Sequence, residues 1–283
     1  MDGDTVTWTR DTPWRQGHVL TPEAVQALGL SHPETPGDTC VVVISHDCDL
    51  ANEVLQSEPD VEVIIGRHIL KGDGNYFWAK APRTLHVEVM HDGTERIIEL
   101  IATAKHSIPK QVLAEFFPDS AYAFSGKSLS VLRSWLGVRY NRAAFPDPFV
   151  DRLSQSKIDK GLARIIEPVG NLVSAVYFNV DDGKEVDHSD GSPYELAIVL
   201  AHPPGEDPEH NADEVEKLET EIETLFAKKC FDQAAERWNG IALTACISIS
   251  EDDLTISKAR LLTQWRLEYM TLRAGEDSPG PID

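Results

Sequence analysis

Short apolar runs separated by turn residues predict β structure in the first third of the chain. Residues 40–44 form a β-branched run bounded by polar positions, which is typical of a strand buried on both faces. Apolar residues alternate with other types over 61–65 and 85–89, as in strands with one buried face. The Asp-Gly turn within 91–94 predicts a hairpin whose returning strand covers residues 96–102.

Helical spacing of apolar residues appears further along the chain. A helix is predicted to begin near Ser107, with this serine at the N-cap and Pro109 in the first turn. Its buried face would consist of Val112, Leu113, Phe116 and Phe117. Three more helices are predicted over residues 128–144, 213–229 and 255–273, and 213–229 has the clearest apolar stripe.

The second half adds apolar segments over 173–180, 194–201 and 241–249, which predict core strands. The first third is predicted to consist of strands, and the rest of the chain to mix strands with helices. This arrangement indicates an α+β protein. We expect a β-barrel-like domain with a basic helix over residues 1–150, a mixed α+β domain over 160–273 and a disordered tail over 274–283.

Composition narrows the classes of function. The chain has 26 basic and 47 acidic side chains, and the net charge of -21 disfavours broad binding to phosphate backbones. No apolar run approaches about 18 residues, so no membrane span is expected. The 4 cysteines form no CxxC pair, and the acidic N-terminus is unlike a signal peptide, so we expect a cytoplasmic protein with reduced thiols. No motif indicates a cofactor or a structural metal.

Polar side chains gather directly after the buried strand, in the sequence Ser45-His46-Asp47-Cys48-Asp49. A rigid strand end is a common place for a binding or catalytic site. Three uses are open. His46, Cys48 and Asp49 are possible metal ligands, Cys48 is a possible nucleophile beside His46, and Asp47 or Asp49 is a possible cap of a turn or helix.

The most basic stretch of the chain contains Arg133, Arg139 and Arg142. Arg139 and Arg142 lie three positions apart and would share one helix face. Guanidinium groups bind phosphates and carboxylates well, so these two residues are candidates for ligand binding. The alternative is that they pair with acidic side chains of the same chain.

Two resemblances bear on these residues. The segments Trp-Arg-Gln-Gly-His-Val-Leu at 14–20 and Ser-His-Asp-Cys-Asp at 45–49, with Phe-Pro-Asp at 145–147, resemble an uncharacterised bacterial family with an S-[QH]-x-C-D motif. That resemblance covers roughly the first 150 residues and selects Ser45, Cys48 and Asp49 as the characteristic part of the cluster. It implies no particular activity.

The N-terminal half also distantly resembles the MazF/PemK toxin family, in residues 16–19, 41–45 and 98–110. This likeness implies a small SH3-like barrel and, in the toxins, ribonuclease activity. The chain departs from that family where Asp-Thr-Cys at 38–40 replaces the usual Arg-Pro before the buried strand. The departure and the acidic composition put the nuclease activity in doubt while leaving the barrel as an expectation.

Two functions from different classes follow. The first is a binding or regulatory component of a bacterial conflict or defence system, with a protein partner. The second is a nuclease-like enzyme in which Cys48, Asp49 and His46 are catalytic, while Ser45 and Arg139 or Arg142 bind RNA or another phosphate ligand. The sequence determines neither the ligand nor the oligomeric state.

Overall fold

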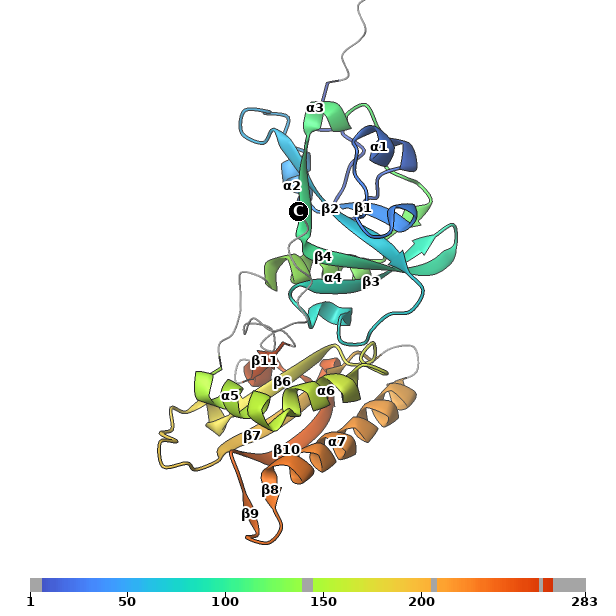
Figure 1. Cartoon of the computed structure of the whole chain (residues 1–283). Helices are drawn as coiled ribbons and strands as arrows, with labels where there is room; N and C mark the ends of the chain where they lie inside the picture. The colour runs from blue at the N-terminus through green and yellow to red at the C-terminus, as the bar shows by residue number, and fades with distance from the viewer. Residues whose placement is uncertain (1–6, 139–144, 205–207, 260–261, 267–283) are drawn as a thin grey trace, which may run out of the picture. The chain divides into compact units, whose positions relative to one another are not determined.

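The computed structural model describes residues 7–138, 145–204, 208–259 and 262–266 (Figure 1). The chain is a mixed α+β protein that divides into two compact units. Of the described residues, unit 1 contains 7–72 and 82–138, and unit 2 contains 73–81 and everything from 145 onward. The short segment 73–81 therefore belongs with the second half of the chain, although it lies in the first third of the sequence.

Unit 1 is built on a curled, fully antiparallel five-stranded sheet that forms a half-barrel. The strand order is β1-β2-β4-β3-β5. The strands are β1 (Thr39–Val43), β2 (Asp60–Ile69), β3 (Thr84–His91), β4 (Thr94–Pro109) and β5 (Tyr122–Ala123). The predicted strands of the first third are thus confirmed, and the hairpin turn joins β3 to β4.

The curl of this sheet has a local cause in β4. Residues 94–101 of β4 pair with β3, while β2 pairs with residues 97–100 and 105–109 of β4, with a shift in the β2–β4 register between Ile64 and Gly66. Such bulges bend a strand and increase its twist. Gly66 is required at the bend, because a Cβ there would lie 2.5 Å from the Glu99 carbonyl oxygen.

The described part of unit 1 also contains four α-helices. They are α1 (Pro22–Ala27), α2 (Asp47–Leu50), α3 (Lys110–Leu113) and α4 (Gly126–Val138). Trp8 and Trp14 are buried in the core, where they join Val41 and Val43 of β1. The outer edge of β1 is covered by the preceding chain, since the amide of Gly17 donates to the Val43 carbonyl at 2.8 Å.

The helix predicted to begin near Ser107 is wrong. β4 continues to Pro109, and Ser107 pairs with Glu62 of β2, so Ser107 is part of the sheet. The helix that follows, α3, has only 4 residues. Of the predicted buried face, Leu113 is buried, but Phe117 is 71% exposed. A strand pairing with residues 45 positions away therefore overrides the local helix-start signal.

Unit 2 contains a four-stranded sheet in the order β10-β7-β6-β11. Its strands are β6 (Ala175–Val180), β7 (Tyr194–His202), β10 (Ile241–Ser250) and β11 (Thr263–Trp265). β10 runs parallel to β7, and the other pairings are antiparallel. A small hairpin of β8 (Phe231–Asp232) and β9 (Arg237–Trp238) precedes β10.

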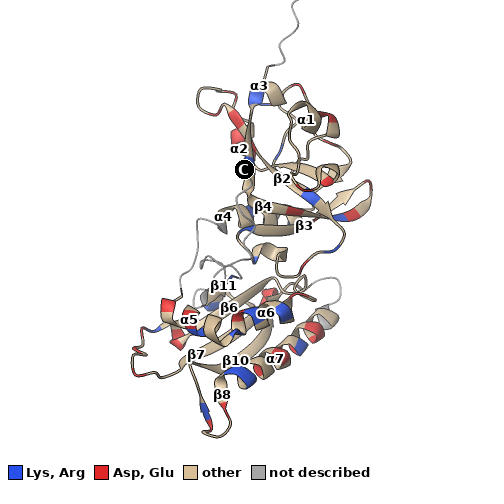
Figure 2. Cartoon of the chain, in the orientation of Figure 1, with Lys and Arg blue, Asp and Glu red and all other residues tan. Residues whose placement is uncertain are grey.

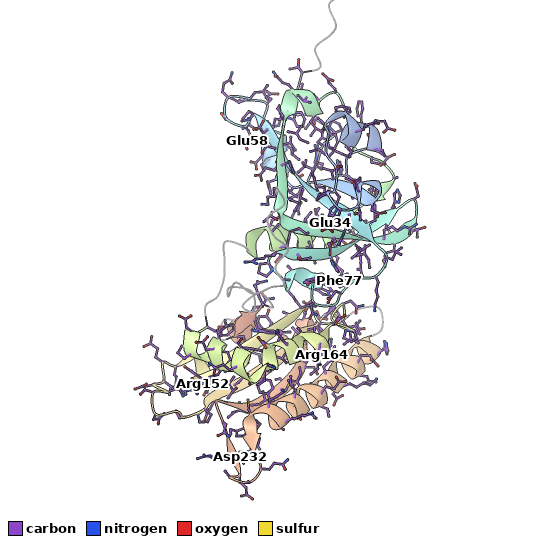
Figure 3. The ribbon with its side chains drawn as sticks, in the orientation of Figure 1. Glu34, Glu58, Phe77, Arg152, Arg164 and Asp232 are labelled. Carbon is purple, nitrogen blue, oxygen red and sulfur yellow. The ribbon has the colours of Figure 1, made fainter. Side chains whose placement is uncertain are left out.

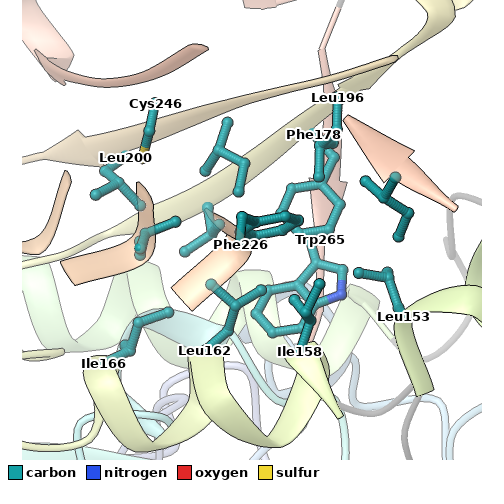
Figure 4. Close-up of a cluster of buried hydrophobic side chains, with 14 of the residues drawn as sticks. Leu153, Ile158, Leu162, Ile166, Phe178, Leu196, Leu200, Phe226, Cys246 and Trp265 are labelled. Atoms are coloured by element: carbon teal, nitrogen blue, oxygen red, sulfur yellow. The ribbon is translucent and has the colours of Figure 1, made fainter. Parts of the chain in front are cut away.

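Among the described residues of unit 2, three helices pack on this sheet around one hydrophobic core (Figure 4). They are α5 (Asp147–Ser156), α6 (Ile158–Ile166) and α7 (Pro208–Cys230). Phe149, Leu162 and Phe226 from these helices meet Leu196 of β7, and each is fully buried. α7 confirms the predicted apolar stripe. Burying each large apolar side chain contributes roughly 1.5–3 kcal/mol.

The prediction of a helix over 255–273 is wrong for the part of this range that the structure describes. Only α8 (Ile256–Ala259) is helical, and β11 follows it as an edge strand paired with β6. The Trp265 ring stacks on Phe178 at 5.1 Å between centroids, and Trp265 is 3% exposed. Residues 267–273 and the predicted tail 274–283 lie outside the described residues. Within the described residues, no helix is long and apolar enough to cross a bilayer.

Segment 73–81 is held in unit 2 by polar contacts and close backbone packing. The Gly74 amide donates to the Glu167 carbonyl at 3.0 Å, and the Trp78 indole donates to the Asn171 carbonyl at 2.6 Å. The Nζ atom of the fully buried Lys80 donates to the carbonyls of Gly170 and Val173. A Cβ on Gly74 would lie 2.5 Å from the Gly170 nitrogen, so this approach needs glycine.

Candidate functional site

Ser45 continues the sheet of unit 1 beyond the end of β1. Its hydroxyl oxygen accepts a hydrogen bond from the Glu62 amide at 2.7 Å. The amides of Ile44 and Ser45 both donate to the Glu62 carbonyl, at 2.9 and 3.2 Å. Ser45 is only 9% exposed, so its side chain mainly attaches the strand end to β2.

His46 acts as the N-cap of α2. Its Nδ1 atom accepts the Cys48 amide at 3.2 Å. Side-chain acceptors at this position satisfy amides that the first helical turn leaves unpaired. The sequence suggested Asp47 or Asp49 as the cap, whereas the imidazole has this role. Because the Nδ1 lone pair of His46 accepts this backbone amide, it is not available to take a proton from the Cys48 thiol.

Asp47 belongs to a polar network with Gln16 and Arg133. One carboxylate oxygen accepts a hydrogen bond from the backbone amide of Gln16 at 2.8 Å, and the other lies 3.6 Å from the Arg133 guanidinium. The buried Gln16 side chain donates to the Ile44 carbonyl and accepts from Arg133, both at 2.8 Å. For Arg133, pairing within the chain is therefore the observed role. Arg139 and Arg142 lie outside the described residues.

The end of α2 rests on Lys110, a fully buried residue. Its ammonium donates to the carbonyls of Asp49 and Asn52, at 2.6 and 2.8 Å, and lies 5.7 Å from the centroid of a Trp8 ring. Cations stabilise the last carbonyls of a helix. Burial lowers the pKa of Lys110, and the Glu58 and Asp49 carboxylates oppose that shift. This contact fixes the backbone of Asp49 at the site.

A groove of about 460 Å³ lies beside the cluster. Its lining residues are Gln16, Ile44, Ser45, His46, Asp49, Glu58, Pro59, Asp60, Glu62, Lys105 and Leu136. Four of them carry carboxylates, and Lys105 is the one Lys or Arg in this described lining. Figure 2 shows the acidic residues of α2, and Figure 3 labels Glu58. Cys48 is exposed but does not line the groove.

The groove therefore combines Ser45, His46 and Asp49 and leaves Cys48 outside. Its acidic lining favours cationic groups over phosphates. Among the residues that the structure describes, no group of three or more His, Cys, Asp or Glu side chains is arranged to hold a metal ion.

A second hollow in unit 1, of about 860 Å³, contains His68, His91 and Tyr122, a grouping that the sequence did not predict. The His91 and Tyr122 rings stack at 4.3 Å, and the His68 Nε2 atom lies 2.7 Å from the Tyr122 hydroxyl. Burial lowers the pKa of His68, and His91 and Arg96 lower it further. The pairing of β3 with β5 places His91 opposite Tyr122, and His68 is contributed by β2.

Comparisons with known proteins identified no relative of this chain. No family model, no curated protein and no solved structure matches the chain, so no comparison adds weight to either resemblance.

Proposed function

We propose that this chain is a binding component whose acidic groove in unit 1 receives a positively charged segment of a partner protein. The observation that supports this proposal most directly is the lining of the groove, where Asp49, Glu58, Asp60 and Glu62 face one lysine, Lys105. Complementary charges steer association and select partners. The overall charge of -21 acts in the same direction at longer range.

The groove is also built on a rigid support. Lys110 holds the carbonyl of Asp49, and the Ser45 hydroxyl holds the Glu62 amide. A site supported in this way loses little conformational freedom when a ligand binds. In this proposal the half-barrel is an SH3-like scaffold, and the protein is a regulatory component of a bacterial conflict or defence system.

The alternative, a MazF/PemK-like nuclease, has weaker support. A nuclease that uses Cys48 and His46 needs the imidazole to contact the thiol, but Nδ1 of His46 accepts a backbone amide. A phosphate in the groove would meet four carboxylate residues. Arg139 and Arg142, the candidate phosphate ligands, lie outside the described residues.

Binding of a fluorescent deca-lysine peptide to the full chain tests the proposal. Asp49→Asn combined with Glu62→Gln should weaken binding about tenfold in low salt, because each carboxylate contributes up to about 1 kcal/mol at close range. Both side chains are exposed, so the variant should fold normally. Fluorescence anisotropy measures the affinity.

The matched control neutralises two exposed acids of unit 1 that do not line the groove, Glu95→Gln with Glu115→Gln. This variant should bind the peptide within about twofold of the parent. Equal weakening by the two pairs would show that only overall charge attracts the peptide and would refute a specific groove. Tighter binding of single-stranded RNA than of the peptide would favour the nuclease alternative.

A further inference from the structure

The second hollow of unit 1 is lined by a group of three aromatic rings. The centroids of His91 and Tyr122 lie 4.3 Å apart, with an angle of 17° between the ring planes. The His68 ring lies 5.7 Å from Tyr122 at 21°, and its Nε2 atom lies 2.7 Å from the Tyr122 hydroxyl. The three rings are therefore nearly parallel, and a hydrogen bond fixes two of them.

This group leaves one ring face open. Tyr122 covers one face of His91, and His68 lies 5.9 Å from His91 but only 5.7 Å from Tyr122. A ring on the opposite face of His91 would lie much further from Tyr122, so His68 does not cover that face. The His91 side chain is 33% exposed. A planar ring in the hollow can therefore continue the stack, as bases do on aromatic side chains.

Charged groups of both signs accompany the rings. Arg96 of β4 is exposed and lines the hollow. Burial lowers the pKa of His68, and His91 and Arg96 lower it further. Asp38, another lining residue, opposes this shift, so a cation and a carboxylate both act on the ring. Asp119 also lines the hollow, and a backbone amide donates to one of its carboxylate oxygens at 2.9 Å. The hollow thus offers both a hydrogen-bond donor and carboxylate acceptors.

Much of the remaining lining is apolar. Leu20, Val25 and Leu30 come from the chain around α1, and Ile69 and Leu70 from the end of β2. Leu70 is fully exposed, so apolar surface is available to a ligand at this site. The volume of about 860 Å³ lies within the usual range of small-molecule pockets. Apolar walls with a few polar groups are typical of such pockets.

We propose that this hollow binds a free guanine nucleoside, with the base stacked on His91. Arg96 donates to the O6 and N7 atoms of the base, which is the usual pairing of a guanidinium with guanine. The N–H groups on the opposite edge of the base donate to the carboxylate of Asp38 or Asp119. Adenine is disfavoured because its amino group, a donor, would replace O6 opposite Arg96.

The ligand carries no phosphate group in this proposal. Arg96 is the one Lys or Arg among the described residues that line the hollow, and Asp38 and Asp119 accompany it. A net charge of -21 also repels phosphates. The site is separate from the acidic groove, because the two described linings share no residue. Nucleoside binding and peptide binding therefore stand or fall independently.

Isothermal titration calorimetry of the full chain with guanosine tests the proposal. We expect one site with a Kd of about 10–100 μM, which is ordinary for a ligand of this size. Arg96→Gln and His91→Ala should each weaken binding about tenfold, because the first removes the donor and the second removes the stacking ring. Adenosine should bind the parent about tenfold more weakly than guanosine.

The matched controls are Arg10→Gln and His106→Ala, which change exposed residues of unit 1 outside the hollow. Both should bind guanosine within about twofold of the parent, as should the groove variant Asp49→Asn with Glu62→Gln.

Three results would overturn the proposal. The first is no binding at about 1 mM guanosine. The second is equal binding of indole and guanosine, which would show an apolar hollow without polar recognition. The third is guanosine 5′-monophosphate or a guanine oligonucleotide binding more than about tenfold tighter than guanosine, which would show that phosphate is recognised. None of these results would alter the peptide-binding result.

Discussion

At the scale of residues, the polar cluster after β1 has unequal members. Ser45, His46 and Asp47 are engaged with the backbone or with Gln16 and so shape the strand end. Cys48 and Asp49 are exposed and differ in that only Asp49 lines the groove. Position in the sequence groups the five residues, but hydrogen bonding gives Ser45, His46 and Asp47 structural roles, although Ser45 and His46 also line the groove.

The four cysteines should differ in reactivity because they differ in exposure. Cys48 is exposed, whereas Cys40, Cys230 and Cys246 are buried, and burial raises the pKa of each of these three thiols. Because the thiolate is the reactive form, we expect one fast-reacting thiol in the native protein. Reaction with Ellman's reagent should give about one equivalent quickly and the rest on denaturation.

Cys48→Ala should remove the fast equivalent and leave the slow ones. Cys48→Ser is the conservative control for folding. Two or more fast thiols in the native parent would contradict the burial of the other cysteines.

At the scale of elements, most strands follow from local pattern, because alternation and β-branched runs record which faces are buried. β1, β7, β10 and α7 were predictable in this way. The ends of β4 and β11 were not, since the pairing of Ser107 with Glu62 and the stacking of Trp265 on Phe178 join distant positions. The acidic groove was partly predictable through Ser45–Asp49, but residues 58–62 reach it only through the β1–β2 pairing.

Segment 73–81 should make the stability of unit 2 depend on pH. Burial lowers the pKa of Lys80 to about 7, although Asp73 opposes the shift. Between this value and the ordinary value of 10.5, the unfolded state binds more protons. Stability should therefore rise with pH over this window, with a slope approaching about 1.4 kcal/mol per pH unit, and be lost as pH falls toward 7.

Urea unfolding followed by circular dichroism at pH 7.5, 8.5 and 9.5 measures this slope. Lys80→Met keeps a long side chain without the titrating group and should show a smaller slope than the parent. Equal slopes for the two proteins would contradict a strongly lowered pKa at this position.

At the scale of the whole molecule, acidic side chains dominate the electrostatics. A net charge of -21 disfavours the folded state through self-repulsion. Raising NaCl from 20 to 200 mM shortens the screening length to below about 10 Å. The melting temperature at pH 7.5 should therefore rise by a few degrees, as expected from a gain of about 1–2 kcal/mol.

Calorimetry measures the effect, and pH provides the control. Near pH 4.8, the isoelectric point, the same increase in salt should change the melting temperature much less. A melting temperature that falls with added salt at pH 7.5 would show that attractive ion pairs outweigh the repulsion.

The sequence alone determined the α+β class, most core strands, the long helix of unit 2, the acidic character and the location of the cluster after β1. These properties follow from local periodicity and from sums over the chain. Only the tertiary structure assigned segment 73–81 to unit 2, made His46 a helix cap and brought His68, His91 and Tyr122 into contact. Such contacts depend on three-dimensional distance and hydrogen-bond direction, which no one-dimensional pattern records.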